Sequence, residues 1–293
     1  MTLWILMLLP LLGAACIYPA RASISKWIAL FVSLVVFVIS VLMAVQFDCW
    51  GNSGGTCFKS SIPWINLLGI TLDVGVDSVA LLLVLLTTLL TPICVWSSFT
   101  AITKRRREYY AWLLILETAM LGVFSAQDLI LFYVSFELTL VPMFFLIAIY
   151  GGDNRAHASV KFFIYTFTGS LVALAGFIYV AWQYQVASFG TWSFAISDLT
   201  AFSATLSSTE QSAILLALLA GFAVKIPVFP VHTWLPLAHT EAPTAGSVIL
   251  AGVLLKLGTF GLYRFVLTMV PEAVVIYAPL IGILAIIGIL YAA

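Results

Sequence analysis

Gly221-Phe222-Ala223-Val224-Lys225-Ile226-Pro227-Val228-Phe229-Pro230 is the stretch that constrains this protein most. It lies inside an apolar run, residues 212–236, and a helix of about 20 apolar residues is enough to cross the hydrocarbon core of a membrane. The two prolines lack N–H donors, so we expect the carbonyls of Ala223 and Ile226 to lose their usual helical partners. In lipid, such a break is tolerated only where protein or a water-filled cavity supplies replacements. The run therefore predicts a broken transmembrane helix with Lys225 at the break.

The composition of the whole chain also indicates a membrane protein. Of 293 residues, 63% are hydrophobic and 8% are charged, whereas a soluble domain carries about 25% charged residues. These values exclude an ordinary soluble domain, a disordered chain and a nucleic-acid-binding protein with a basic face. Twelve Lys and Arg balance twelve Asp and Glu, so no net field attracts a charged partner. We predict a polytopic membrane protein.

The apolar runs predict an all-α fold, a bundle of about nine transmembrane helices. A β-barrel would need alternating segments of about ten residues, and the sequence has none. The predicted spans lie near residues 2–19, 27–46, 76–98, 110–126, 129–149, 161–183, 212–236, 245–268 and 273–291.

The first span has two interpretations. It ends in Gly13-Ala14-Ala15-Cys16, which is faintly similar to a lipoprotein cleavage site. However, no positive residue precedes the apolar stretch, as a cleaved signal would require. We therefore expect a retained first helix.

The positive charges of the loops predict the orientation. Counted from the N-terminus, the side of the even-numbered loops holds only Lys59 and Arg264, the latter near the end of a span, and the odd-numbered loops hold eight Lys and Arg. The positive-inside rule then places the odd loops on the cytoplasmic or matrix side and the N-terminus outside. We read Lys104-Arg105-Arg106-Arg107 as part of this pattern; a nucleic-acid or lipid patch is the alternative. The eight residues are Arg21, Lys26, Lys104, Arg105, Arg106, Arg107, Arg155 and Lys161.

Two of the four cysteines lie together in a predicted outer loop, residues 47–75. Cys49 and Cys57 surround Gly51, Gly54 and Gly55. On the oxidising side of a bacterial membrane they can form a disulfide, or they remain two free thiols. Cys16 and Cys94 lie within spans, where cysteine usually serves packing. No metal-binding spacing links the four.

Three charged residues lie well inside predicted spans: Glu137, Lys225 and Lys256. Each ionised group at the centre of a bilayer costs roughly 2.5–3.5 kcal/mol on insertion scales, so such groups face a partner or a wet cavity and commonly mark an ion path. The alternative is a buried ion pair that only ties helices together, although one pair would need only one lysine. Glu117 is a fourth candidate, with helix packing as its alternative role.

His232 and His239 follow the predicted break. Histidine titrates near neutral pH, so the two side chains could pass protons between the inner water and Lys225. An ordinary histidine at the membrane interface is the alternative for each. Zinc binding is disfavoured because no Cys or carboxylate cluster lies nearby. We assign no metal and no cofactor to this chain, since it has no nucleotide-binding glycine motif, no C-x-x-C pair and no histidine pattern for haem.

Three blocks of sequence resemble the antiporter-like membrane-arm subunits of respiratory complex I. Glu137-Leu138-Thr139-Leu140-Val141-Pro142-Met143, followed by Gly151-Gly152, is similar to their fifth helix. Residues 225–239 are similar to their broken seventh helix, and residues 241–247 with 254–258 to their eighth. Two positions depart from the pattern: Phe136 stands where many relatives have Trp, and Leu237 where many have Asp.

The resemblance implies an organisation of the chain. Residues 1–109 would form three N-terminal helices, residues 110–268 the first antiporter-type repeat of five helices, and residues 269–293 the start of a second repeat. Family members have about fourteen spans, so the chain is expected to be a fragment truncated at its C-terminus.

The resemblance also implies a function, a proton-translocating subunit of NADH:quinone oxidoreductase. Lys225 would carry the proton, Glu137 would stabilise its charged form, Lys256 would receive the proton, and His232, His239 and Glu117 would support the path. The partners would be other membrane-arm subunits of complex I and the lipid bilayer, and NAD, FMN, iron–sulfur clusters and quinone would be bound in partner subunits. Alternatives are a multisubunit sodium/proton antiporter, a membrane-bound hydrogenase, or a structural spacer. We expect a multi-pass protein of a bacterial inner or a mitochondrial inner membrane that binds no nucleic acid.

Overall fold

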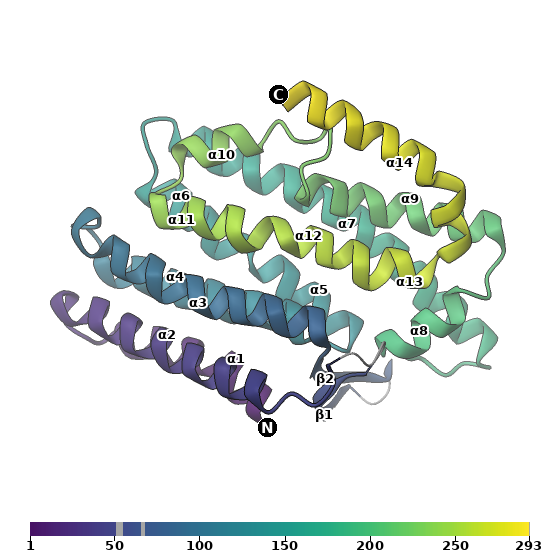
Figure 1. The fold of residues 1–293 in the computed structure, drawn as a ribbon, viewed down its shortest axis with the longest axis horizontal. Helices are drawn as coiled ribbons and strands as arrows, with labels where there is room; N and C mark the ends of the chain where they lie inside the picture. The colour runs from purple at the N-terminus through teal and green to yellow at the C-terminus, as the bar shows by residue number, and fades with distance from the viewer. Residues whose placement is uncertain (51–54, 66–67, 293) are drawn as a thin grey trace.

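The computed structural model describes residues 1–50, 55–65 and 68–292, and long helices lying side by side make up most of it (Figure 1). The N-terminus lies at the same end of the bundle as a small β-hairpin, and the short helix α10 lies at the opposite end. The helices are α1 (Thr2–Ile17), α2 (Ala22–Val45), α3 (Ser78–Ala101), α4 (Arg106–Ser125), α5 (Leu129–Leu138), α6 (Leu140–Tyr150), α7 (Arg155–Ala187), α8 (Ile196–Ser203), α9 (Ser208–Lys225), α10 (Leu235–Glu241), α11 (Thr244–Ile249), α12 (Leu255–Gly261), α13 (Leu267–Met269) and α14 (Pro271–Ala292).

One long helical segment, Thr244–Met269, changes its winding twice. The π-helical turns η2 (Leu250–Leu254) and η3 (Leu262–Val266) separate α11, α12 and α13. A π turn holds one residue more than an α turn, and such turns are frequent at functional sites.

Each of the nine predicted spans falls on a helical segment. Within the described residues, six segments are long and apolar enough to cross a membrane: α2, α3, α5 with α6, α7, Thr244–Met269 and α14. The helix α1 is apolar but has 16 residues. The count of nine spans therefore stays a prediction. The seventh predicted span differs most, because α9 ends at Lys225 and the helix does not continue to residue 236.

The first helix is an integral part of the bundle. Leu3, Leu6 and Ile17 of α1 are fully buried, and α1 packs against both α2 and α4. Whether the first helix is retained in the mature protein stays a prediction.

The expectation of an all-α chain is wrong in one segment. Strands β1 (Cys57–Ile65) and β2 (Ile70–Val76) pair as an antiparallel hairpin, with Ser61 opposite Asp73. The β-branched residues of β2 suit a half-buried strand, and burial of its last three residues anchors the hairpin on the bundle. The hairpin contains Cys57, which forms a disulfide with Cys49 across 6.2 Å between Cα atoms. Gly51 and Gly54 of the predicted ring lie outside the described residues.

The predicted outer loop, residues 47–75, lies at the same end of the bundle as the segment between α7 and α9. The backbone N–H of Ile196 donates to the Gln127 carbonyl at 3.0 Å, and that of Gln127 donates to the Asp73 carbonyl at 2.8 Å. The loop before α5 thus joins the hairpin to the segment that carries α8. Which side of the membrane this end faces stays a prediction.

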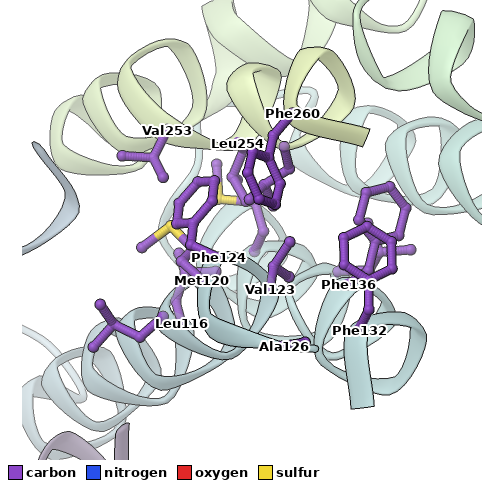
Figure 2. Packing of buried hydrophobic residues seen from close by; sticks show 14 of the residues in the cluster. Leu116, Met120, Val123, Phe124, Ala126, Phe132, Phe136, Val253, Leu254 and Phe260 are labelled. Atoms are coloured by element: carbon purple, nitrogen blue, oxygen red, sulfur yellow. The ribbon is translucent and has the colours of Figure 1, made fainter. Parts of the chain in front are cut away.

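The apolar core lies where α4 meets the Thr244–Met269 segment and α5. Figure 2 shows Phe124 and Met120 of α4 facing Leu254 and Phe260, with Phe132 and Phe136 of α5 beside them. The rings of Phe124 and Phe260 lie 5.3 Å apart, edge to face. This packing holds α5 and the Thr244–Met269 segment, which both approach Lys225, against α4.

Candidate functional site

The seventh predicted span is broken directly after Lys225. The helix α9 begins with a capping box formed by Ser207 and Glu210 and ends at Lys225. Residues 226–234, which include both prolines, form turns rather than helix, and α10 begins at Leu235. The predicted break is therefore present, and it begins at the lysine.

Two carbonyls just before the break accept hydrogen bonds from donors other than their usual helical partners. The Val228 N–H donates to the Ala223 carbonyl at 2.9 Å, and the Trp234 indole N–H donates to the Val224 carbonyl at 2.9 Å. The prediction that the Ala223 carbonyl loses its usual i+4 partner holds, but the carbonyl is not left unpaired. Protein groups, rather than solvent alone, thus stabilise the interruption.

A second interruption lies opposite the first. The helix α5 ends at Leu138 and α6 begins at Leu140, so Thr139 separates them. Pro142 explains this break, because it lacks the N–H that would bond to the Leu138 carbonyl. The Thr139 hydroxyl donates to the Phe136 carbonyl at 2.7 Å, which orients its lone pairs.

Lys225 lies between the two interruptions and is only 4% exposed. Its Nζ donates to Thr139 Oγ1 at 3.2 Å and lies 4.0 Å from the centre of the Phe136 ring. A hydroxyl and the face of an aromatic ring can both stabilise an ammonium group without neutralising it. The lysine is thus held by two neutral groups.

Glu137 is near this site but is not paired with the lysine. In the part of the chain that the structure describes, no ion pair of 4.0 Å or less joins the Glu137 carboxylate to Lys225. Both Glu137 carboxylate oxygens are buried without a hydrogen-bond partner. Tyr133, one turn earlier, also has a buried hydroxyl without a partner. Glu137 and Lys225, the predicted pair, therefore lie near each other but form no ion pair, and we call this pair open.

Lys256 occupies a different surface. It is exposed on α12, and its Nζ donates to the Ala251 carbonyl of η2. The same helix nevertheless touches the break, because a Cβ on Gly258 would lie 3.2 Å from the Lys225 Cβ and 3.1 Å from the Ile226 nitrogen. Only glycine allows so close an approach, so α12 reaches the break while Lys256 points away from it.

Glu117 is fully buried near the middle of α4, and neither of its carboxylate oxygens has a hydrogen-bond partner. Among the described residues it makes no hydrogen bond to Glu137, Lys225 or Lys256. An ionised carboxylate without a partner is costly to bury, and whether Glu117 supports the path or serves helix packing stays a prediction.

His232 lies in the non-helical segment between α9 and α10. It lines a cavity of about 510 Å³ together with Pro227, Phe229 and Tyr291, and its Nδ1 is buried without a partner. The imidazole of His232 is therefore at the wall of an open cavity, and only a few residues along the chain separate it from Lys225. In the described ranges, no group of three or more His, Cys, Asp or Glu could hold a metal ion.

His239 lies on α10, further from the break, and burial lowers its pKa. The last residue of α10, Glu241, is hydrogen-bonded to the loop between α6 and α7. The Asn154 N–H donates to the Glu241 carboxylate at 2.9 Å, and the Gly152 N–H donates to the Glu241 carbonyl at 2.9 Å. A Cβ on Gly151 would lie 2.7 Å from the same carbonyl. The two glycines singled out in the sequence thus allow this docking.

Sequence reasoning missed a second polar cluster, at the hairpin end of the bundle. Arg264 of η3 forms an ion pair of 2.7 Å with Asp77 and also donates to the Gln127 side chain. Asp77 accepts from the Ala80 N–H at 2.7 Å and so caps α3. Asp128, next to Gln127, caps α5 by accepting from the Ile130 N–H at 2.8 Å. Burial raises the pKa of the Asp128 carboxyl to about 6.

The signal for these missed residues is present in the sequence but weak. Asp77 and Asp128 each precede an apolar run, as N-cap residues do. Thr139 lies two residues after Glu137, within the quoted motif. Nothing in the spacing of Arg264 indicates its partner, which lies 187 positions away.

Comparison with known proteins connects this arrangement to a family. Residues 126–293 match the family described as NADH:quinone oxidoreductase/Mrp antiporter, transmembrane. The chain is 41% identical over 298 residues to NADH-quinone oxidoreductase subunit M of Rhodobacter capsulatus, and 39% identical over 290 residues to NADH-ubiquinone oxidoreductase chain 4 of Marchantia polymorpha. Each match covers 98% of this chain.

A solved structure has the same architecture. A chain of respiratory complex I from Thermus thermophilus with bound NADH superposes with a TM-score of 0.81 at 26% identity, over 96% of this chain and 56% of that chain. The chain likewise spans 57% of the Rhodobacter protein and 56% of the Marchantia protein.

Proposed function

Because this chain belongs to the NADH:quinone oxidoreductase/Mrp antiporter transmembrane family, we propose that it is the proton-translocating membrane subunit of the subunit M (chain 4) type in an NADH:quinone oxidoreductase. The proteins of that name are its relatives over 98% of its length. Electron transfer from NADH to quinone would take place in other subunits, and this chain would move protons.

The observation that carries the proposal is the state of Lys225. It is buried at a broken helix, and its contacts are a threonine hydroxyl and an aromatic ring rather than a carboxylate. A lysine that only ties helices together would be paired, because an unpaired buried charge is destabilising. A lysine that carries a proton must be able to lose it, and desolvation favours that loss.

The proposed cycle uses the open pair of Glu137 and Lys225. When Glu137 approaches Lys225, its negative charge stabilises the protonated lysine. When the two separate, as they are in the structure, burial among neutral groups favours release of the proton. His232 and His239 supply protons through the cavity at the break, Lys256 receives them, and Glu117 supports the path. The outward position of Lys256 fits a residue that passes the proton on to a further element.

The finer organisation belongs to the same proposal. The chain would have nine spans with its N-terminus outside, three N-terminal helices in residues 1–109, an antiporter-type repeat of five helices in residues 110–268, and the start of a second repeat in residues 269–293. Its partners would be the other membrane-arm subunits and the surrounding bilayer, without nucleic acid. NAD, FMN, iron–sulfur clusters and quinone would belong to partner subunits of a bacterial inner, or a mitochondrial inner, membrane.

A sodium/proton antiporter subunit is the second candidate, and the description of the matched family itself includes Mrp antiporters. A membrane-bound hydrogenase subunit would share the fold. Both alternatives retain a proton-carrying Lys225, so they differ from the first proposal in the ion exchanged and in the partner subunits.

The experiment is a Lys225→Ala change in the assembled complex reconstituted into vesicles. We expect the number of protons moved per NADH oxidised to fall, with normal assembly, because the carrier is gone. Lys225→Arg should fail equally, since arginine does not release its proton at working pH. Lys59→Ala, an exposed lysine of β1, is the matched control and should pump normally.

Three results would overturn the proposal in different ways. An unchanged proton-to-electron ratio in Lys225→Ala would remove Lys225 from the path. Loss of assembly in both Lys225 variants would favour the structural spacer. Activity that requires sodium and is independent of NADH would favour the antiporter.

A further inference from the structure

The helices α1 and α4 leave an open groove between them at the end of the bundle that carries Lys104-Arg105-Arg106-Arg107. Its volume is about 470 Å³, and apolar side chains that include Leu11, Ala15, Trp112 and Ile115 line most of it. From Arg107 to Ile115 the groove follows α4 for about 12 Å, at 1.5 Å per helical residue. It lies far along the chain from the broken helix and is outside the proposed proton path.

One end of the groove is charged and the other is not. Arg107 lines the end near the start of α4, and its guanidinium is exposed. The only hydrogen bond that Arg107 makes within the described residues is a long one, 3.4 Å, to the Tyr18 carbonyl. The neighbouring Glu108 is already paired with Arg105 at 2.6 Å. Most of the donors of Arg107 therefore remain available to an anion.

The size of the groove limits what can occupy it. Its volume is about 470 Å³, and it is open along one side. A helix with its side chains is about 10–12 Å across, so a partner helix would lie over the groove rather than inside it. A single hydrocarbon chain is narrow and flexible enough to enter it.

We propose that this groove binds an anionic phospholipid, with one acyl chain along Leu11, Ala15 and Ile115 and the phosphate on Arg107. Guanidinium and phosphate match in geometry as well as in charge. Basic pockets between transmembrane helices are typical binding sites for anionic headgroups. Tyr18, which is 81% exposed at the same end, is an aromatic residue of the kind that gathers at the level of the headgroups.

The test is retention of lipid by the assembled complex that contains this chain. The complex is stripped with detergent and titrated with phosphatidylglycerol or phosphatidylcholine, and bound lipid is counted by native mass spectrometry. We expect one tightly held phosphatidylglycerol per copy of this chain, and binding of it about tenfold weaker in Arg107→Gln, as expected when one charge-assisted contact is lost.

Two further variants separate the headgroup from the acyl chain. Ala15→Phe fills the groove from an exposed position of α1 and should abolish binding while every positive charge stays in place. Lys104→Gln removes the same charge as Arg107→Gln from a neighbouring exposed residue that does not line the groove, and should leave binding within about twofold of wild type.

The proposal fails if phosphatidylcholine binds as tightly as phosphatidylglycerol, because the site would then not select anions. It also fails if Ala15→Phe retains the lipid, or if Lys104→Gln and Arg107→Gln weaken binding equally, since the attraction would then be a property of the whole basic end. Absence of any retained phosphatidylglycerol in the wild-type complex would likewise overturn the proposal, because the groove would then not hold a lipid.

Discussion

The bundle contains two polar regions, and they differ in whether their charged side chains form ion pairs. At the hairpin end, Arg264 is paired with Asp77 at 2.7 Å, and Asp77 also caps α3. At the broken helix, Lys225 and Glu137 lie near each other but are not paired, and the Glu137 oxygens have no hydrogen-bond partner. The Arg264–Asp77 pair is closed, whereas Lys225 and Glu137 have no ionic partners among the described residues.

The difference separates the stabilising role of a buried charge from a transport role. A charge that is paired and hydrogen-bonded holds helices in register, and removing either partner is costly. A proton carrier needs the opposite, because a closed ion pair would trap the proton. We therefore expect mutations at the hairpin end to affect mainly stability, and mutations at the break to affect mainly transport.

The largest expected effect on stability is from Arg264→Met. This change leaves the Asp77 carboxylate without its cation, and we expect a loss of about 3 kcal/mol in the free energy of unfolding, measured by denaturant titration in detergent. Arg155→Met, which removes an exposed arginine, should change stability by less than about 0.5 kcal/mol. A loss smaller than about 1 kcal/mol for Arg264→Met would mean that the ion pair does not hold the hairpin end together.

A smaller effect on stability is expected from Thr139→Val. The change keeps the shape of the side chain but removes the oxygen that accepts from Lys225, and we expect a loss of about 1 kcal/mol with a clear fall in proton translocation. Thr139→Ser keeps the hydroxyl and should restore translocation. If Thr139→Val pumps as well as wild type, the contact with Lys225 is only structural.

The smallest effect is a dependence of stability on pH at Asp128. Its pKa in the folded protein is raised by burial to about 6, above its ordinary value near 3.8. The folded state therefore favours the protonated acid, so this contribution to stability is complete below about pH 4 and is lost as the pH rises through about 6. The melting temperature of wild type should fall relative to Asp128→Asn between pH 4 and pH 7.

The opposite trend at Asp128 would also be informative. Its carboxylate accepts from the N–H groups of Ile130 and Leu131 at the start of α5, and these favour the ionised form. A wild type that gains stability relative to Asp128→Asn as the pH rises would show that the helix terminus outweighs burial.

Much of the fold could be predicted from the sequence, because membrane helices are selected by composition. Long apolar runs placed a helical segment at every expected position, and the two prolines after Lys225 predicted the break. The hairpin was missed, since its strands are short and lie in a loop where no long apolar run directs attention to them. Pro142 was quoted as part of a motif, but the interruption that it causes at Thr139 was not predicted.

The candidate site was only partly predictable, because helix periodicity does not give the direction of a side chain in an apolar bundle. Lys225 could be selected by its position in the run. The exposure of Lys256 could not, since the two π-helical turns beside α12 change which face it occupies. The partners of Arg264 and Lys225 lie 187 and 86 positions away, a separation over which single-sequence patterns carry no signal.

The two π-helical turns make this transmembrane helix unusually permissive to a change in its length. Deleting one residue from Leu250–Leu254 would convert η2 into an ordinary α turn without breaking the helix. Because a π turn completes about one turn with one residue more than an α turn, the later residues would keep nearly the same orientation relative to α11. A single-codon deletion at either π turn would therefore leave Lys256 on its present face of the helix, and we expect length variation among relatives to be concentrated at these two places.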